Sequence, residues 1–223
     1  SIDKNMFFFG IAFIFLATSK NVFCGNFTVT DEVWFEVEVK NMDGEGEDYK
    51  GKFTIALFGQ VAPMTVLNFV SLARGYEKGK EKLHYKNTFI HRIVPDFVIQ
   101  MGDITIGDGT GGRSIYGPKF NDEPFILSHR SPGWVAMANH GPDTNGSQFY
   151  ILLSKERRLE GKHVVFGKVL KGFDVIKTFG EVESNPNTAV PKKPVKILNC
   201  GVNENISRYD LKPSELDSTE DMN

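Results

Sequence analysis

The chain has 223 residues, of which 40% are hydrophobic and 24% are charged, and its 26 basic and 28 acidic side chains give a formal net charge of -2. This size and composition suit a globular chain of one domain or a small pair, and they exclude a disordered, collagen-like or multi-span membrane protein. The balanced charge also disfavours a general nucleic-acid binder, because no overall positive field would attract a polyanion.

The first feature along the chain is an uncharged, mostly apolar run over residues 6–17, which follows Lys4. The run is shorter than the roughly 20 residues that a membrane-spanning helix needs, and polar residues follow it directly. Such a run is typical of a signal-peptide core, with cleavage near Ser19 or Cys24. We therefore expect residues 1–24 to be a signal peptide that leaves no stable membrane span. The alternatives are an uncleaved anchor or a buried terminal helix.

Export would decide the chemistry of the cysteines and of the glycosylation sequons. Cleavage after Cys24 leaves only Cys200, whereas earlier cleavage leaves two cysteines that could form a disulfide. Asn26 and Asn205 begin N-x-Ser/Thr sequons and are the predicted glycosylation sites, with chance occurrence as the alternative. A third match, at Asn145, lies in a Gly-rich apolar stretch where a glycan would clash with the fold.

The central part of the chain consists of short alternating segments separated by Gly, Pro and Asn. Apolar and polar residues alternate with period two from Val33 to Val39 and from Phe53 to Leu57, which indicates two half-buried strands. Six further segments are predicted as strands: 88–94, 97–102, 133–138, 148–153, 163–169 and 195–200. Eight strands in one domain favour a barrel or a sandwich.

Two segments have the periodicity of helices instead. Apolar residues recur at helical spacing over 63–74, with Pro63 suited to the first turn and Gly75 to the end. A second helix is predicted from Phe173 to Phe179, where apolar residues lie three apart before Gly180. Since strands and helices do not alternate as βαβ units, a Rossmann domain is disfavoured.

The stretch GDGTGG at residues 107–112 matches the G-x-G-x-x-G pattern of dinucleotide-binding loops. A phosphate site of that kind needs a helix directly after the glycines, and Pro118 would interrupt such a helix. Arg113 also stands where a P-loop has Lys. We therefore interpret the stretch as a tight loop. The histidines show no ligand-type spacing and no G-x-S-x-G elbow occurs, so neither a metal site nor serine-hydrolase chemistry is expected.

The segment FIHRIVPDFVIQMGD, residues 89–103, combines apolar strands with isolated polar groups. If its two halves pair, Arg92 and Gln100 meet across neighbouring strands and the amide orients the guanidinium. An Arg amid so many apolar residues needs a partner of this kind. The alternative is an Arg at a strand end that reaches solvent.

Two later segments carry further polar side chains on predicted strands. In MANHGPDTNGSQFY, period two places Gln148 and Tyr150 on one face of the strand and Phe149 on the other. The segment LEGKHVVFGKV supplies Leu159 and His163. Taken singly, each of these residues is equally consistent with core packing, and an isolated His is more often structural than functional.

The chain resembles the cyclophilin family of peptidyl-prolyl cis-trans isomerases, which has segments like FIHRIVPDFVIQMGD, GDGTGGRSIYG, MANHGPDTNGSQFY and LEGKHVVFGKV in the same order. The resemblance places an isomerase domain at residues 27–203, and the export signal suggests the secretory-pathway, cyclophilin B-like subtype. It implies a mainly β fold: a closed eight-stranded antiparallel β-barrel capped by two α-helices. The strands and helices predicted above agree with this architecture.

The resemblance also implies a site. It gives a catalytic role to Arg92, together with Phe97 and Gln100. It assigns substrate binding to Val98, Gln148, Tyr150, Leu159 and His163 in the proline pocket, to Ala138 and Asn139 at the edge that holds the peptide backbone, and to Gly109, Thr110 and His140 at the adjoining pocket. The implied reaction needs no metal or cofactor: a guanidinium that donates near the proline nitrogen favours the twisted amide over either planar isomer.

Several positions depart from the usual family pattern. Val98 replaces Met and Tyr150 replaces Phe, so the pocket is reshaped and gains a hydroxyl near its wall. Arg158 replaces a Trp that commonly helps to hold cyclosporin, so weakened binding of this cyclic peptide is expected. His140 replaces a small residue and would partly gate the adjoining pocket. The basic insert 77–86 is interpreted as a solvated surface loop.

Residues 204–223 carry six acidic and two basic side chains and almost no apolar ones, which predicts an acidic, flexible tail. The whole sequence therefore predicts a monomeric isomerase of the secretory pathway, in the endoplasmic reticulum lumen or secreted, that acts on proline-containing segments of client proteins. An escort protein that binds one such client, with catalysis incidental, is the first alternative. An extracellular signalling ligand is the second.

Overall fold

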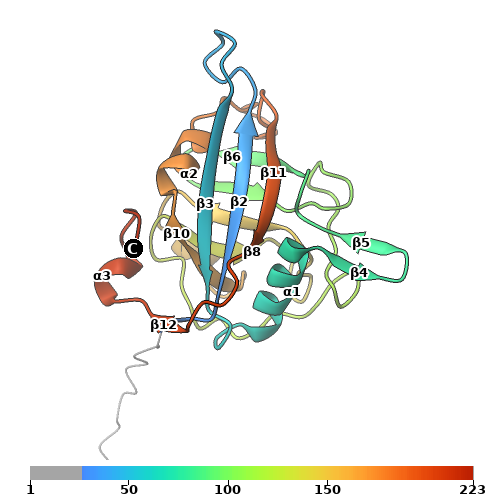
Figure 1. Cartoon of the computed structure of the whole chain (residues 1–223), viewed down its shortest axis with the longest axis vertical. Helices are drawn as coiled ribbons and strands as arrows, with labels where there is room; N and C mark the ends of the chain where they lie inside the picture. The colour runs from blue at the N-terminus through green and yellow to red at the C-terminus, as the bar shows by residue number, and fades with distance from the viewer. Residues whose placement is uncertain (1–26, 223) are drawn as a thin grey trace, which may run out of the picture.

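The computed structural model describes residues 27–222. The predicted signal peptide, Cys24 and the sequon at Asn26 lie outside these residues. The barrel strands are β2 (Asp31–Val39), β3 (Tyr49–Leu57), β6 (Phe89–Val94), β7 (Val98–Met101), β8 (Trp134–Met137), β9 (Phe149–Leu152), β10 (Val165–Lys171) and β11 (Val195–Val202). They close in the order β10-β3-β2-β11-β6-β7-β9-β8, and every ladder is antiparallel (Figure 1). The predicted closed eight-stranded barrel is confirmed.

The barrel interior is filled by the apolar side of the alternating strands. Phe35 and Phe53 lie opposite each other on β2 and β3, and their rings stack with centroids 5.2 Å apart. The ring of Phe69, from helix α1 (Pro63–Arg74), packs edge-on against Phe149 at 4.9 Å. Helix α2 (Phe173–Gly180) contributes Phe179 against Tyr49 at 5.6 Å. The two predicted helices thus cover the barrel near opposite ends of β3 (Figure 1).

A second apolar cluster lies on the outer side of β7, β8 and β9. Because side chains alternate along β9, Phe149 and Ile151 enter the barrel while Tyr150 and Leu152 belong to the outer cluster, as the sequence predicted. Val98 of β7 lies opposite Leu152, and Ala136 of β8 lies opposite Tyr150. The outer cluster forms the apolar floor on which the predicted site is built.

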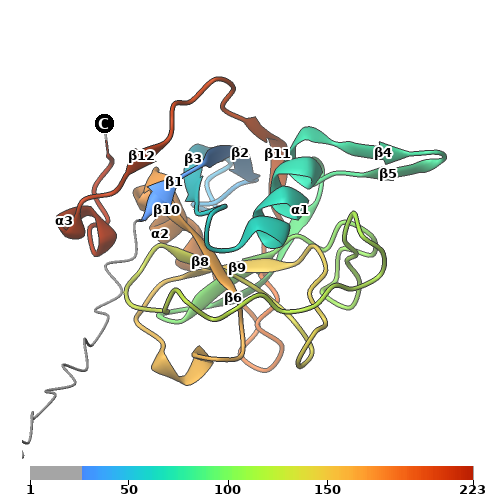
Figure 2. The ribbon, with the colours of Figure 1, turned by 90° about the horizontal axis from the view of Figure 1, so that it is seen from below.

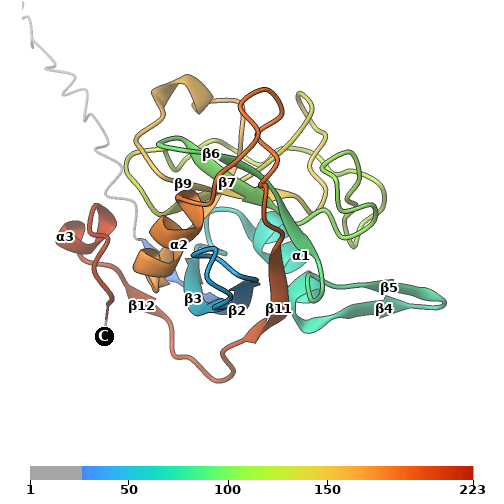
Figure 3. The same cartoon turned by 90° about the horizontal axis from the view of Figure 1, so that it is seen from above.

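The basic insert forms a hairpin rather than a loop. Strands β4 (Tyr76–Lys78) and β5 (Glu81–Leu83) pair across a turn at Gly79, and the hairpin projects from the body of the molecule (Figures 2 and 3). Glu77 lies opposite Lys82, and their side chains form an ion pair at 3.0 Å. Opposite charges on facing positions explain why so polar a segment forms strands. The lysines of the segment are exposed, as predicted, but the strands were missed, and Leu83 and Tyr85 are buried in the core.

The expectation of a solvated, flexible tail over 204–223 differs from the structure. Strand β12 (Tyr209–Asp210) pairs with β1 (Thr28–Val29), and a short third helix, α3 (Pro213–Leu216), follows (Figure 2). Leu211, Leu216 and Met222 of this segment are buried in the outer cluster, and Ile206 and Tyr209 pack against it. The indole nitrogen of Trp134 donates to the Leu216 carbonyl at 3.0 Å. The segment therefore packs on the barrel despite its acidic composition.

Polar contacts complete the attachment of this C-terminal segment. The amine of Lys168 is fully buried and donates to the Ser218 carbonyl at 2.8 Å. Burial lowers the pKa of this amine to about 8. The Asp221 carboxylate accepts from the Gly172 amide at 2.7 Å, at the start of α2. The negative charges that predicted a mobile tail thus include groups that hold the segment in place.

Three further features bear on the sequence predictions. Cys200 is buried, and burial raises the pKa of its thiol to about 12. Asn145 is completely buried and donates to Asp122 at 2.7 Å, which agrees with the argument against a glycan there, whereas Asn205 is exposed. Over residues 27–222, no helix is both long and apolar enough to cross a membrane.

Candidate active site

Arg92 lies on β6, and the register of the β6–β7 hairpin sets it opposite Gln100 on β7. The tight connection between the strands includes Asp96, whose φ of 57° lies in the left-handed region. The guanidinium Nη1 lies 3.5 Å from Gln100 Oε1, at the long limit for a hydrogen bond. The predicted meeting of these two side chains is therefore confirmed, and Arg92 itself is half-buried.

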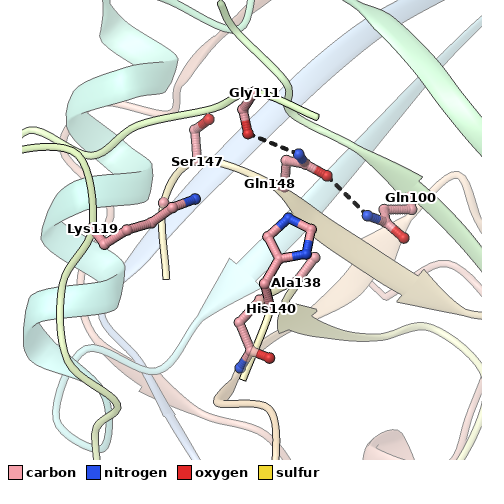
Figure 4. Close-up of a pocket in the computed structure, with 9 residues that line it drawn as sticks. Gln100, Gly111, Lys119, Ala138, His140, Ser147 and Gln148 are labelled. Atoms are coloured by element: carbon pink, nitrogen blue, oxygen red, sulfur yellow. Dashed lines mark hydrogen bonds between the residues drawn. The ribbon is translucent and has the colours of Figure 1, made fainter. Parts of the chain in front are cut away.

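The Gln100 amide is held in turn by Gln148 on the neighbouring segment. Gln100 Nε2 donates to Gln148 Oε1 at 2.8 Å. Gln148 Nε2 donates to the carbonyls of Gly109 and Gly111, both at 2.9 Å, and Figure 4 shows the bond to Gly111. These contacts fix which way each amide faces, because two carbonyl oxygens can accept only from a nitrogen. A chain of hydrogen bonds therefore runs from the Gly-rich loop to the guanidinium of Arg92.

The Gly-rich loop is wound around the buried carboxylate of Asp103. The backbone amides of Thr105, Ile106, Gly109 and Gly111 donate to this carboxylate at 2.9 to 3.1 Å. Burial alone would raise the pKa of Asp103, but the amide hydrogen bonds outweigh it and hold the pKa well below its usual range. The interpretation of GDGTGG as a tight loop is supported, since these amides donate to the chain's own carboxylate.

The predicted proline pocket gathers on the outer cluster. Val98 and Tyr150 are buried there, and the half-buried side chains of Phe97 and Leu159 pack against them. Leu159 is the last residue of the 3₁₀ helix η1 (Arg157–Leu159). The ring of His163 meets the ring of Tyr150 edge-on, with centroids 5.5 Å apart. All five pocket residues of this group therefore lie together, although they come from separate parts of the chain.

His163 is fixed in one tautomer by its surroundings. Its Nδ1 lies 3.0 Å from the Met137 carbonyl, which can only accept, so Nδ1 carries the hydrogen and Nε2 is left free. Burial lowers the pKa of His163, and the hydrogen bond to Met137 partly offsets this effect. The imidazole is therefore neutral at physiological pH and offers an acceptor nitrogen.

Ala138 and Asn139 follow directly after β8. The Ala138 amide donates to the Gln148 carbonyl at 3.0 Å, which ties this edge to the strand segment below it. The side chain of Asn139 donates to the Lys162 carbonyl at 2.8 Å and accepts from the Gly141 amide at 3.3 Å. Its amide group thus braces two local loops, which is consistent with the prediction that Asn139 binds a peptide through its backbone.

A small pocket adjoins Gln100 and Gln148 (Figure 4). Its lining consists of Gln100, Gly111, Lys119, Ala138, Asn139, His140, Gly146, Ser147 and Gln148. His140 is exposed and lines this pocket, the position from which a partial gate is predicted. Gly109 and Thr110 are not part of the lining, and the Thr110 hydroxyl instead donates to Asp108 at 2.6 Å. Lys119 was missed, although it follows the quoted GDGTGGRSIYG motif by only two residues.

Arg158, the predicted departure at the inhibitor site, is exposed on η1. Its guanidinium forms an ion pair with Glu156 at 3.0 Å and lies 6.0 Å from the ring centroid of Phe97. A cation beside Phe97 presents charge and donors where an indole would present an apolar plate. The position is thus next to the pocket, as the resemblance implied.

One family model matches residues 40–202, and its description is cyclophilin type peptidyl-prolyl cis-trans isomerase/CLD. The matched region is well over half of the chain, and it includes every residue predicted to be catalytic or substrate-binding. Proteins of this family bind proline-containing peptides and cyclosporin in general. The chain therefore belongs to the cyclophilin family, and its barrel is a cyclophilin-type peptidyl-prolyl cis-trans isomerase domain.

Proposed function

We propose that this isomerase works in the secretory pathway, where Arg92 catalyses the rotation of X–Pro bonds in folding client proteins. The observation that carries the catalytic part is the hydrogen-bonded chain from the Gly-rich loop through Gln148 and Gln100 to Arg92, directly beside an apolar pocket. A guanidinium held in place can act on a substrate without first reorganising, which is the condition for electrostatic catalysis.

The pocket and the guanidinium have different tasks in this proposal. The proline ring is held by the apolar pocket of Phe97, Val98, Tyr150 and Leu159. The rest of the peptide is held by the backbone of Asn139. The amide bond then rotates while the ring stays in place. Twisting removes the amide resonance, against a barrier of roughly 18–20 kcal/mol, and leaves a more basic nitrogen. Arg92 donates to the substrate near this nitrogen and so stabilises the twisted state more than either planar state.

The test of catalysis is the isomerisation rate of a short X–Pro peptide with the native protein and with Arg92→Ala. Losing one charge-assisted hydrogen bond, worth roughly 1.5–3 kcal/mol, slows the reaction by about one to two decades. Arg74→Ala is the matched control, because Arg74 is exposed on α1 and pairs with Glu204. A native protein that binds a proline peptide tightly but does not accelerate isomerisation would instead support the escort alternative.

The proposed compartment rests on the apolar run at residues 6–17 and on the sequon at Asn205, which is exposed as a glycan acceptor must be. It is tested by the N-terminal residue and the glycan status of the protein recovered from cells. A mature chain that begins near residue 20 or 25 and carries a glycan at Asn205 supports secretory-pathway entry. A chain that retains residues 6–17 and has no glycan contradicts it.

A further inference from the structure

Tyr150 contacts a second histidine that the proposed function does not use. The hydroxyl of Tyr150 lies 2.8 Å from Nε2 of His129, and the two rings are nearly parallel, at 17° with centroids 6.0 Å apart. His129 is almost completely buried, with 1% of its surface exposed. A buried imidazole with a short hydrogen bond to Tyr150 can fix the position of the Tyr150 side chain, which forms part of the pocket wall.

The other side of His129 is held by Glu160. One carboxylate oxygen accepts from the His129 backbone amide at 2.9 Å, and the other lies 3.4 Å from Nδ1. Glu160 follows Leu159 in the chain, so the contact also restrains the 3₁₀ wall of the pocket. His129 therefore joins two walls of the proline pocket, one on β9 and one at η1.

The partners fix the direction of the hydrogen bonds. A carboxylate only accepts, so in the neutral imidazole Nδ1 of His129 carries the hydrogen and Nε2 is an acceptor. The hydroxyl of Tyr150 must then donate to Nε2. Its hydrogen points away from the pocket toward His129, and the wall that remains for the proline ring is aromatic carbon.

We infer that His129 is a positioning residue of the proline pocket, which holds the Tyr150 ring and keeps its hydroxyl hydrogen turned away from the substrate. The inference rests on the proposed function, because it assigns the pocket to the proline ring. It explains how this chain carries a Tyr in an apolar pocket: the added polar group has its own buried partner.

Burial favours the neutral form of His129, against the carboxylates that lie around it. Burial lowers the pKa of His129, and the neighbouring carboxylate of Glu160 only partly offsets this. Glu156 also acts to raise the pKa, while His163, whose ring centroid is 6.5 Å away, acts to lower it. If His129 were protonated, Nε2 would become a donor and the hydroxyl hydrogen of Tyr150 would have to turn elsewhere.

The direct test is the tautomer of His129, read from the ¹⁵N chemical shifts of its ring at neutral pH. The expected result is a protonated Nδ1 and an unprotonated Nε2. Tyr150→Phe is expected to shift the Nε2 resonance, because it removes the donor. A protonated Nε2, or a resonance that Tyr150→Phe leaves unchanged, overturns the inference. This readout does not depend on catalysis, so it stands apart from the Arg92→Ala test of the proposed function.

A kinetic cycle gives the second test, with KM and kcat separated by exchange spectroscopy on an X–Pro peptide. Each of His129→Leu and Tyr150→Phe leaves the other buried group unpaired, and each raises KM roughly 3- to 10-fold, as expected for one hydrogen bond. The double variant removes both groups, so its KM is expected to rise by a smaller factor than the product of the factors for the two single variants. Single effects that simply multiply, or that fall on kcat alone, contradict a positioning role.

Discussion

Arg130 and Asp217 form a bidentate ion pair, in which Nε and Nη2 of the arginine each donate to a different carboxylate oxygen at 2.8 Å. The pair joins the loop before β8 to the C-terminal segment, 87 residues away. Arg130 stands between His129, which contacts the pocket, and Ser131, which donates to the Leu216 carbonyl at 3.3 Å. The C-terminal segment is therefore anchored immediately beside the loop that supports the proline pocket.

This anchoring predicts that the C-terminal segment contributes to stability mainly through its apolar residues. Leu216→Ala is expected to lower the free energy of unfolding by about 2–4 kcal/mol, because it empties a buried site beside Trp134. Asp217→Asn is expected to cost at most about 1 kcal/mol, because that carboxylate is half-exposed. Urea unfolding measures both. Glu220→Gln is the control, and a Leu216→Ala protein as stable as this control contradicts the packing.

Buried Lys168 predicts an unusual dependence of stability on pH. Its pKa is lowered by burial to about 8 in the folded protein, from 10.5, so between these two values the unfolded chain binds more protons than the folded one. The free energy of unfolding contributed by this group therefore rises as pH rises from about 8 to about 10.5. One pKa unit corresponds to about 1.4 kcal/mol. The free energy of unfolding of the native protein, measured at pH 7.5 and 9.5, is expected to rise with pH, and Lys168→Met is expected to reduce that rise. An equal rise in both proteins would refute the role of Lys168.

The chain of amide hydrogen bonds predicts that Gln148 matters for catalysis, although the Gln100 side chain lies between it and Arg92. Gln148→Leu removes the acceptor of the Gln100 amide and the donor to the Gly-rich loop, so the guanidinium loses its orientation. We expect kcat/KM for a short X–Pro peptide to fall about tenfold, equivalent to one hydrogen bond. The measurement needs a melting curve alongside, to show that the variant is folded. A rate within twofold of the native value would separate Gln148 from catalysis.

Arg158 predicts weak inhibition by cyclosporin and its recovery by a single substitution. Arg158→Trp exchanges an exposed cation near Phe97 for a large apolar ring with one donor, so cyclosporin affinity is expected to rise at least about tenfold. Titration calorimetry of the native and variant proteins measures this. The neighbouring Arg157→Trp is the matched control and should leave the affinity unchanged. Inhibition of the native protein by nanomolar cyclosporin would contradict the prediction.

The barrel could be predicted because its signals are local. Period-two alternation marked β2 and β3, short mostly apolar segments between Gly, Pro and Asn marked the other six strands of the closed sheet, and three- to four-residue spacing marked α1 and α2. The β4–β5 hairpin was missed because its apolar residues, Tyr76 and Leu83, form a single facing pair at its base, and the rest of its pairing joins charged side chains. The C-terminal segment was missed because its partners on the barrel are distant in the chain: Lys168 lies 50 residues from Ser218, and Trp134 lies 82 residues from Leu216.

Only one contact of the site could be predicted from local sequence signals. The approach of Arg92 to Gln100 follows from a hairpin, and the remaining pocket residues entered through the family resemblance. Nothing local revealed Asp103, because an Asp after a strand is common and its amide donors come from the fold of the loop that follows. His129 was likewise not found, because its contact with Tyr150 joins residues that are 21 apart in the chain and belong to different loops and strands.

The loop around Asp103 resembles a phosphate-binding loop that is already occupied by an anion of the same chain. In a nucleotide-binding protein, the backbone amides of a glycine-rich loop donate to the negatively charged phosphate of a bound ligand. Here the carboxylate of Asp103 is covalently part of the fold and is always in place. The carbonyls of Gly109 and Gly111 are consequently turned outward to Gln148. The amides of this loop thus bind Asp103, and its carbonyls provide the fixed end of the chain of hydrogen bonds that leads to Arg92.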